Sequence, residues 1–138
     1  MAGYSKRTLV DKLGIKPGDR VLIIDAPPEY PETLGALPPG AVRLPKAEPP
    51  VDFIHLFAST QGELRQKLPG LRAALKPSGM LWVSWPKKAA KMPTDLTENL
   101  VREIAIANRL VDVKVAAVDE TWSGLKLVIR LVDRQPAG

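Results

Sequence analysis

The sequence has 138 residues, enough for one domain with a buried core, and 45% of them are apolar, as in ordinary soluble proteins. It has no cysteine, which excludes disulfides, thiolate metal sites and a cysteine nucleophile, and which fits a reducing cytoplasm. No apolar run approaches the ~20 residues of a membrane span, and the basic N-terminus lacks the apolar core of a signal peptide. We therefore expect a cytoplasmic domain with no membrane contact. The net charge is +5, yet most basic residues are interspersed with acids, so nucleic acid is not an expected partner.

The N-terminal part of the chain predicts a few short elements around a proline-rich segment. An apolar run from Val21 to Ile24 indicates a buried first strand that closes at Asp25. Eight prolines fall between residues 26 and 50, and such a density favours stiff, extended loops with little helix. The expected elements are a helix over 5–13 that ends at Gly14, a strand over 20–26, a helical turn over 31–37 with Pro31 first, and a strand over 41–44.

The middle of the chain predicts a buried strand followed by a long helix. Residues 51–57 are apolar except Asp52 and His55, and a lone histidine in a buried strand is more often a hydrogen-bonded core residue than a catalyst. Thr60 and Glu63 have the spacing of a capping box at a helix start. Leucines then recur at helical spacing, and Pro69 is expected to kink or split that helix.

The apolar stretch from Met80 to Trp85 predicts the central strand of the sheet. Five of its six residues are apolar with little alternation, which is typical of a strand that is covered on both faces. A turn is expected before it, over 76–79, and Pro86 should end it because proline has no N–H to donate. Two lysines follow, at the end of a strand where ligands bind in open α/β sheets.

The C-terminal part of the chain predicts a helix and a hairpin. Thr94 is a good N-cap, and Asp95 and Glu98 suit the positive end of a helix that would end at Asn108. The remaining expected segments are strands over 111–118 and 125–132, paired as an antiparallel hairpin, and a flexible tail over 133–138.

Strands that alternate with helices and then end in a hairpin indicate an α/β fold. This order predicts a mostly parallel sheet covered by helices on both faces, with an antiparallel C-terminal hairpin. We expect residues 1–138 to form this single, three-layer, Rossmann-like domain.

Several segments resemble known families. Residues 13–25 (LGIKPGDRVLIID) resemble the first strand of class I S-adenosylmethionine-dependent methyltransferases, and residues 75–81 (LKPSGML) resemble a later turn and strand of that fold. More closely, residues 82–88, 94–98 and 119–130 are similar to the bacterial family catalogued as domain of unknown function 3052. The resemblance covers nearly the whole chain and implies a methyltransferase-like fold, without an established activity.

The loop after the first strand departs from the methyltransferase pattern. The resemblance implies a glycine-rich loop there, and an acid at the end of strand two for the ribose hydroxyls of the cofactor. Residues 25–30 (DAPPEY) contain two prolines and no glycine, and Lys46 is expected in place of the acid. We therefore expect no cofactor, and interpret the chain as a degenerate methyltransferase-like domain that binds a small molecule or a protein without methyl transfer. The alternative is an active transferase that uses S-adenosylmethionine in an altered pocket.

Loops at the carboxyl edge of the predicted sheet are expected to surround one crevice. The candidate ligand-binding residues on those loops are Asp25, Glu29, Tyr30, Trp85, Lys87, Lys88, Asp119, Glu120, Trp122 and Ser123. Their carboxylates, ammonium groups and indoles suit a zwitterionic or aromatic ligand, or an anion. The alternatives are structural: both tryptophans in the core, the lysines on a solvated loop, and the acids of the last loop in a turn. No catalytic pair and no set of metal ligands is expected.

Overall fold

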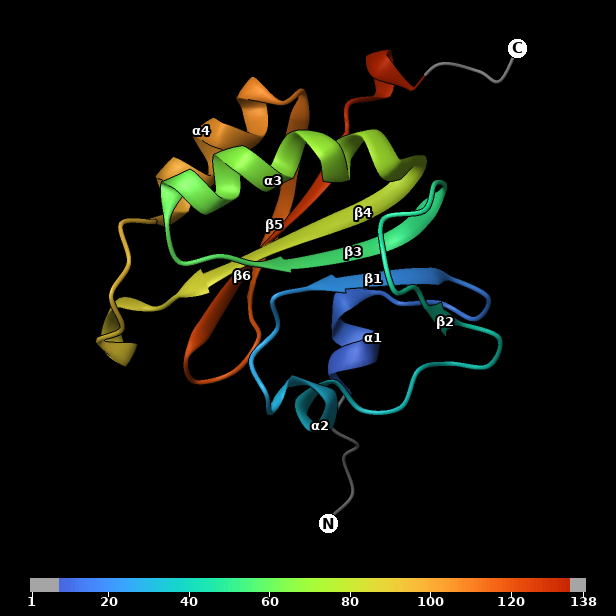
Figure 1. The fold of residues 1–138 in the computed structure, drawn as a ribbon, viewed down its shortest axis with the longest axis horizontal. Coiled ribbons are helices and arrows are strands. Elements are labelled where there is room, and N and C mark those ends of the chain that lie inside the picture. The colour runs from blue at the N-terminus through green and yellow to red at the C-terminus, as the bar shows by residue number, and fades with distance from the viewer. Residues whose placement is uncertain (1–7, 135–138) are drawn as a thin grey trace.

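A computed structural model describes residues 8–134 and, within that range, places six strands in one sheet (Figure 1). The strands are β1 (Arg20–Ile24), β2 (Val42–Arg43), β3 (Val51–Phe57), β4 (Leu75–Pro86), β5 (Leu110–Ala117) and β6 (Trp122–Ile129). The helices are α1 (Leu9–Leu13), α2 (Tyr30–Leu34), α3 (Gln61–Ala74) and α4 (Glu98–Ala107), with 3-10 turns η1 (Lys88–Ala90) and η2 (Leu131–Asp133). The strand order is β2-β1-β3-β4-β6-β5; β1 to β4 run parallel, and β6 is antiparallel to both of its neighbours. The predicted α/β fold, with a mostly parallel sheet and an antiparallel C-terminal hairpin, is confirmed.

Helices cover both faces of the sheet, which makes three layers. α3 and α4 lie on one face, and α1 and α2 lie on the other (Figure 1). Under α3 and α4 the core is mainly aliphatic, with Leu64 and Val101 packed against the strands. The opposite core holds aromatic rings, among them Phe53 and Trp82. The indole Nε1 of Trp82 donates a 2.9 Å hydrogen bond to the carbonyl of Leu13, which fastens α1 to the sheet.

The central strand β4 starts earlier than the sequence predicts. Residues 76–79, expected as a turn, belong to β4, which begins at Leu75 immediately after α3. The turn-forming residues are accommodated as a bulge, since Val51 pairs with Leu75 while Phe53 pairs with Met80. The strand ends at its proline, as expected.

The helix α3 begins with the predicted capping box, in which Thr60 and Glu63 bond each other's backbone N–H groups. It then continues through Pro69 to Ala74, so the expected split does not occur. A proline removes one backbone donor from a helix, but the ring of Pro69 faces solvent, and Leu68 on the buried side holds the helix on the sheet.

The helix α4 begins later than predicted, at Glu98, with Thr97 as its N-cap. The residues expected to start it connect it to α3 instead. The Thr94 hydroxyl donates a 2.6 Å hydrogen bond to the carbonyl of Ser59, and Asp95 Oδ1 accepts a 2.8 Å bond from the N–H of Gln61. Asp95 therefore acts at the positive end of α3 rather than that of α4. The predicted end at Asn108 is confirmed.

The strand β5 forms one edge of the sheet. Its valines do not all face the core: Val113 and Val115 are 53% and 48% exposed. Lys114 pairs directly with Lys126 of β6, and the register shifts between Asp112 and Lys114. This edge therefore carries a like-charge pair and a bulge.

The two ends of the described chain are short. β6 begins at Trp122, earlier than predicted, and is followed by η2, where Asp133 Oδ2 accepts a 2.8 Å hydrogen bond from Arg130 Nε. Asp133 therefore belongs to an ordered turn rather than a tail. Residues 135–138 of the predicted tail, and 5–7 of the predicted first helix, lie outside the described residues.

Gly79→Ala is expected to destabilise the domain, because a Cβ at this position would lie 2.8 Å from the Asp52 carbonyl oxygen and 2.9 Å from Leu75 Cδ1. The free energy of unfolding, measured in urea, should fall by about 1–3 kcal/mol, as is usual for overpacking. Gly70→Ala is the control: Gly70 lies in α3 with nothing within 4 Å of the added Cβ. Alanine should stabilise that helix by about 0.5–1 kcal/mol. Equal stabilities of G79A and the wild type would contradict the bulge.

Candidate functional site

The carboxyl edge of the sheet begins at Asp25, directly after β1. Asp25 has a φ of 58°, in the left-handed region that favours glycine but that aspartate tolerates better than most residues. Its carboxylate pairs with the ammonium group of Lys67 on α3. Pro27 and Pro28 follow, and neither has a backbone N–H that could donate to a ligand. The chain then enters α2, where the N–H of Tyr30 bonds the carbonyl of Pro27 at 3.0 Å.

A series of buried hydrogen bonds links α2, β3 and β4 on the face that α1 and α2 cover. Tyr30 Oη is 2.6 Å from His55 Nδ1, and His55 Nε2 is 2.7 Å from Ser84 Oγ. His55 and Ser84 are fully buried, and Tyr30 is 2% exposed. The His55 ring also stacks on Phe57, with ring centroids 4.2 Å apart. Both imidazole nitrogens have partners, which confirms that His55 is a hydrogen-bonded core residue.

Burial determines the protonation states of this Tyr30–His55–Ser84 series. It lowers the pKa of His55 to about 3, so the imidazole is neutral near pH 7. It also raises the pKa of the Tyr30 phenol well above the usual range, an effect that the positive charge of Arg43 partly opposes. Serine and histidine can form a nucleophile and base when a substrate reaches them, but the Ser84 hydroxyl is fully buried. The series is therefore structural.

A small cavity of about 130 Å³ lies beside Tyr30. Its lining residues are Ile23, Tyr30, Pro31, Leu34, Gly35, Leu37 and Arg43. Arg43 is the last residue of β2, so the cation at the end of strand two is Arg43, and the expected Lys46 lies beyond the strand. The cavity is smaller than the roughly 300–1,000 Å³ of typical small-molecule pockets.

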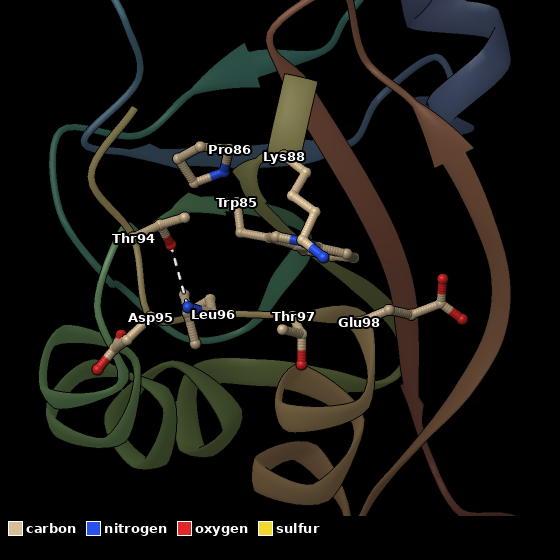
Figure 2. A pocket seen from close by; sticks show the side chains of 8 residues that line it. All are labelled: Trp85, Pro86, Lys88, Thr94, Asp95, Leu96, Thr97 and Glu98. Atoms are coloured by element: carbon tan, nitrogen blue, oxygen red, sulfur yellow. Dashed lines mark hydrogen bonds between the residues drawn. The ribbon is translucent and has the colours of Figure 1, made fainter. Parts of the chain in front are cut away.

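A larger cavity of about 380 Å³ lies at the carboxyl end of β4 and the start of α4 (Figure 2). Its lining residues are Trp85, Pro86, Lys88, Thr94, Asp95, Leu96, Thr97 and Glu98. The indole of Trp85 extends across the cavity and the side chain of Lys88 reaches the same space (Figure 2). Trp85 is only 5% exposed, yet its indole N–H has no hydrogen-bond acceptor within residues 8–134. The volume of this cavity falls within the usual range for a small-molecule pocket.

The two acids in the wall of this larger cavity are engaged elsewhere. Both carboxylates point away from Trp85 in Figure 2. Asp95 accepts from the N–H of Gln61, and Glu98 Oε2 is 2.7 Å from the guanidinium of Arg102. In the described part of the chain no ion pair involves Lys88. The cavity therefore presents an ammonium group that is in no ion pair of the described residues, and two carboxylates that are turned away from Trp85.

The structure distributes the ten candidate residues over both faces of the sheet. Trp85 and Lys88 line the larger cavity, whereas Tyr30 lines the smaller one and belongs to the opposite core. Trp122 lies in that same core, edge-on to Phe57. The ten residues therefore do not surround one crevice, and a role in ligand binding stays a prediction for each of them.

The other candidates have structural contacts or lie at the surface. Asp119 Oδ1 accepts from the N–H groups of Thr121 and Trp122, each at 2.8 Å, so Asp119 holds the hairpin turn. Ser123 pairs with Trp85 between β6 and β4. The remaining placements are Asp25 paired with Lys67, Glu29 exposed at the N-cap of α2, Lys87 bonded through its backbone N–H to Thr121, and Glu120 exposed.

The sequence prediction missed one wall of the larger cavity. Residues 94–98 were expected inside the first turn of a helix, and only the later start of α4 leaves them free to form that wall. The second N-cap candidate at Thr97 was the available signal, since threonine is favoured at helix N-caps.

Two further classes of site find no support in residues 8–134. The described histidine, aspartate and glutamate side chains form no group of three or more that could hold a metal ion. The helices of this range are also too short or too polar to cross a lipid bilayer.

Comparison with known proteins finds similarity at the level of structure. No protein-family model and no curated protein sequence matches the chain. A solved S-adenosylmethionine-dependent methyltransferase from Aquifex aeolicus matches with a TM-score of 0.62 at 13% identity, over 88% of each chain. Aeropyrum pernix fibrillarin with natively bound S-adenosyl-L-methionine matches with a TM-score of 0.62 at 12% identity, over 84% of this chain and 69% of its own. Magnesium protoporphyrin IX methyltransferase from Synechocystis PCC 6803 matches with a TM-score of 0.56 at 11% identity, over 88% and 74%.

This chain has the fold of the class I S-adenosylmethionine-dependent methyltransferases. At such low identities the similarity establishes the fold alone, since one fold hosts many functions. Whether a cofactor fits has to be judged from the residues at the carboxyl edge.

Those residues fit S-adenosylmethionine poorly. The glycine-rich loop implied by the resemblance is replaced by Asp25 to Pro28, with two positions that lack an N–H. Tyr30 turns back over the sheet to His55 and leaves a cavity of about 130 Å³. At the end of β2, Arg43 stands where an acid would bind ribose hydroxyls.

The buried imidazole should make the domain sensitive to acid. The unfolded chain takes up a proton at His55 below the ordinary pKa of 6.5, whereas the folded chain does so only near 3, so stability falls as the pH drops between these values. The free energy of unfolding should decrease by about 1 kcal/mol from about pH 7 to about pH 5.5 through this group alone. Urea denaturation at both pH values measures the decrease.

His55→Gln is the matched variant, because glutamine keeps a donor and an acceptor but does not titrate. The difference between the wild type and H55Q isolates His55 from the carboxylates. If both proteins lose the same stability over this pH range, His55 is not held neutral.

Proposed function

We propose that this domain binds a small ligand without methyl transfer, and that the ligand occupies the larger cavity at Trp85 and Lys88. The observation that carries the proposal is the hydrogen bond of 2.6 Å between Tyr30 Oη and His55 Nδ1. It keeps a buried aromatic side chain beside β1, where the methyltransferase resemblance implies the cofactor. The same fold therefore serves a different site.

The closure of the β1 edge supports the first half of this proposal. A nucleoside cofactor needs backbone donors and a close approach to the loop after β1. Pro27 and Pro28 supply no backbone donor. Asp25 has a φ of 58°, and its carboxylate is paired with Lys67. Space for a ligand here would require α2 to move and the buried imidazole to lose its partner, at a cost of about 1–3 kcal/mol.

The larger cavity supports the second half. It has a volume of about 380 Å³ and combines apolar walls with a few polar groups, as small-molecule sites do. It also lies at the carboxyl end of a parallel strand, the usual place for ligands in α/β sheets. From the sequence similarity we also propose that the chain is related to the family of unknown function 3052. We further propose a cytoplasmic location, which the absence of cysteine fits.

Isothermal titration with S-adenosylmethionine and with S-adenosylhomocysteine tests whether the domain binds this cofactor or its product. We expect no saturable heat at millimolar ligand, because the β1 edge is closed. A methyltransferase of this fold, titrated in the same buffer, shows that the ligand preparations are competent. Micromolar binding of either compound by this domain would overturn the proposal.

Two variants identify the site if heat is observed. Asp25→Asn removes the charge at the β1 edge, and asparagine tolerates the left-handed backbone there. Glu120→Gln removes an exposed charge from the hairpin loop and is the control. Binding that D25N weakens and E120Q does not would support the alternative of an active transferase with an altered cofactor pocket.

A further inference from the structure

We infer that the larger cavity selects a small planar carboxylate, such as an aromatic acid of one or two fused rings. This inference rests on the proposed function and adds a ligand class to it. It follows from the hydrogen-bond donors of the cavity, the direction of its two acids and its apolar wall.

The indole N–H of Trp85 is the first donor. The Trp85 residue is 5% exposed, and its Nε1 is not among the fully enclosed unpartnered atoms of the described chain, so this N–H remains open to solvent or to a ligand. Within residues 8–134 it has no hydrogen-bond acceptor. It differs from Trp82, whose N–H bonds the carbonyl of Leu13. A ligand oxygen in the cavity would supply the missing acceptor.

The ammonium group of Lys88 is the second donor and carries the charge. Lys88 lines the cavity and takes part in no ion pair of the described chain. Glu98 is paired with Arg102, and the carboxylate of Asp95, which accepts one backbone hydrogen bond from Gln61, points away from Trp85 (Figure 2). A charge-assisted hydrogen bond to a carboxylate is about twice as strong as a neutral one.

The first turn of α4 adds to the positive potential. Thr97 caps the helix by accepting from the N–H of Leu100 at 3.2 Å. The N–H groups of Glu98 and Asn99 have no acceptor within residues 8–134. An anion near these groups is stabilised by the helix dipole. Thr97 and Glu98 line the cavity, so this positive helix end lies beside it.

The walls favour a flat ring over a branched or polar ligand body. Trp85, Pro86 and Leu96 form the apolar part of the wall and are buried. The N–H of Trp85 lies in the plane of the indole, so a planar acid whose carboxylate accepts from it places its ring against Pro86 and Leu96 rather than stacking on the same indole. An amine or a zwitterion would need a carboxylate turned toward Trp85, and both carboxylates of the wall point away from it (Figure 2).

Titration with 2-naphthoate, followed by the indole ¹⁵N–¹H signals of the three tryptophans, tests this inference. We expect a saturable shift of the Trp85 indole signal and no shift of the Trp82 signal, since Trp82 is bonded to Leu13. The neutral 2-naphthamide and the cationic 2-naphthylmethylamine have the same ring, and each should bind at least about tenfold more weakly.

Lys88→Met removes the charge and keeps the apolar stem, so its affinity for 2-naphthoate should fall by about tenfold. Its affinity for 2-naphthamide should be unchanged. Lys91→Met is the matched control, because Lys91 is exposed in the same loop and does not line the cavity. Trp85→Phe keeps an aromatic ring but loses the N–H, and should also weaken the carboxylate more than the amide.

The outcomes separate this inference from the proposed function. Equal affinities for the carboxylate and the amide, no saturable shift with any of the three probes, or an unchanged affinity in K88M would overturn the ligand class. None of these results bears on S-adenosylmethionine, whose micromolar binding would overturn the proposed function itself. A selective shift at Trp85 that K88M abolishes and K91M preserves supports the inference.

Discussion

The hydrogen bond between Tyr30 and His55 is the constraint on which the carboxyl edge of this domain depends. It joins the first residue of a one-turn helix to the middle of a central strand, in a place that water does not reach. Both groups are uncharged near pH 7, because burial lowers the pKa of the imidazole and raises the pKa of the phenol. Because the imidazole is also bonded to Ser84, loss of one partner would leave a buried polar atom unsatisfied. These bonds thus hold α2 against the sheet at this edge.

The two faces of the sheet differ near the end of β4, and this strand contributes side chains to both. Successive side chains of a strand point to opposite faces. Ser84 therefore completes the closed series under α2, while its neighbour Trp85 forms a wall of the cavity under α4. A filled core on one face of the sheet is compatible with a cavity on the other, because residues 81–86 of the strand that serves both are buried.

Much of the fold could be predicted from the sequence, and much less of the site. Uninterrupted apolar runs located the buried strands, and the Thr60–Glu63 spacing located α3, since both depend on near neighbours in the chain. The start of α4 was misplaced because Thr94 and Thr97 are equally good caps by type, and the choice depends on a contact from Thr94 to Ser59 in another element. The sequence predicted a single crevice, but the structure has none, because side chains on neighbouring loops point to opposite faces of the sheet. Tyr30 of α2, for example, lies on the face opposite to Trp85. Patterns among near neighbours can be predicted from a sequence, whereas the direction of a side chain is set by its tertiary partners.

The outer strand β5 has a consequence for how this domain meets other chains. An unpaired strand edge is a template onto which a foreign strand can add. Here the ladder is interrupted between Asp112 and Lys114, and Lys114 faces Lys126 across the strands. An incoming strand would meet positive charge. It would also meet a backbone whose bulge breaks the regular spacing of donors and acceptors that a new strand needs. Half-exposed valines can therefore remain at this margin without inviting fibril-like stacking.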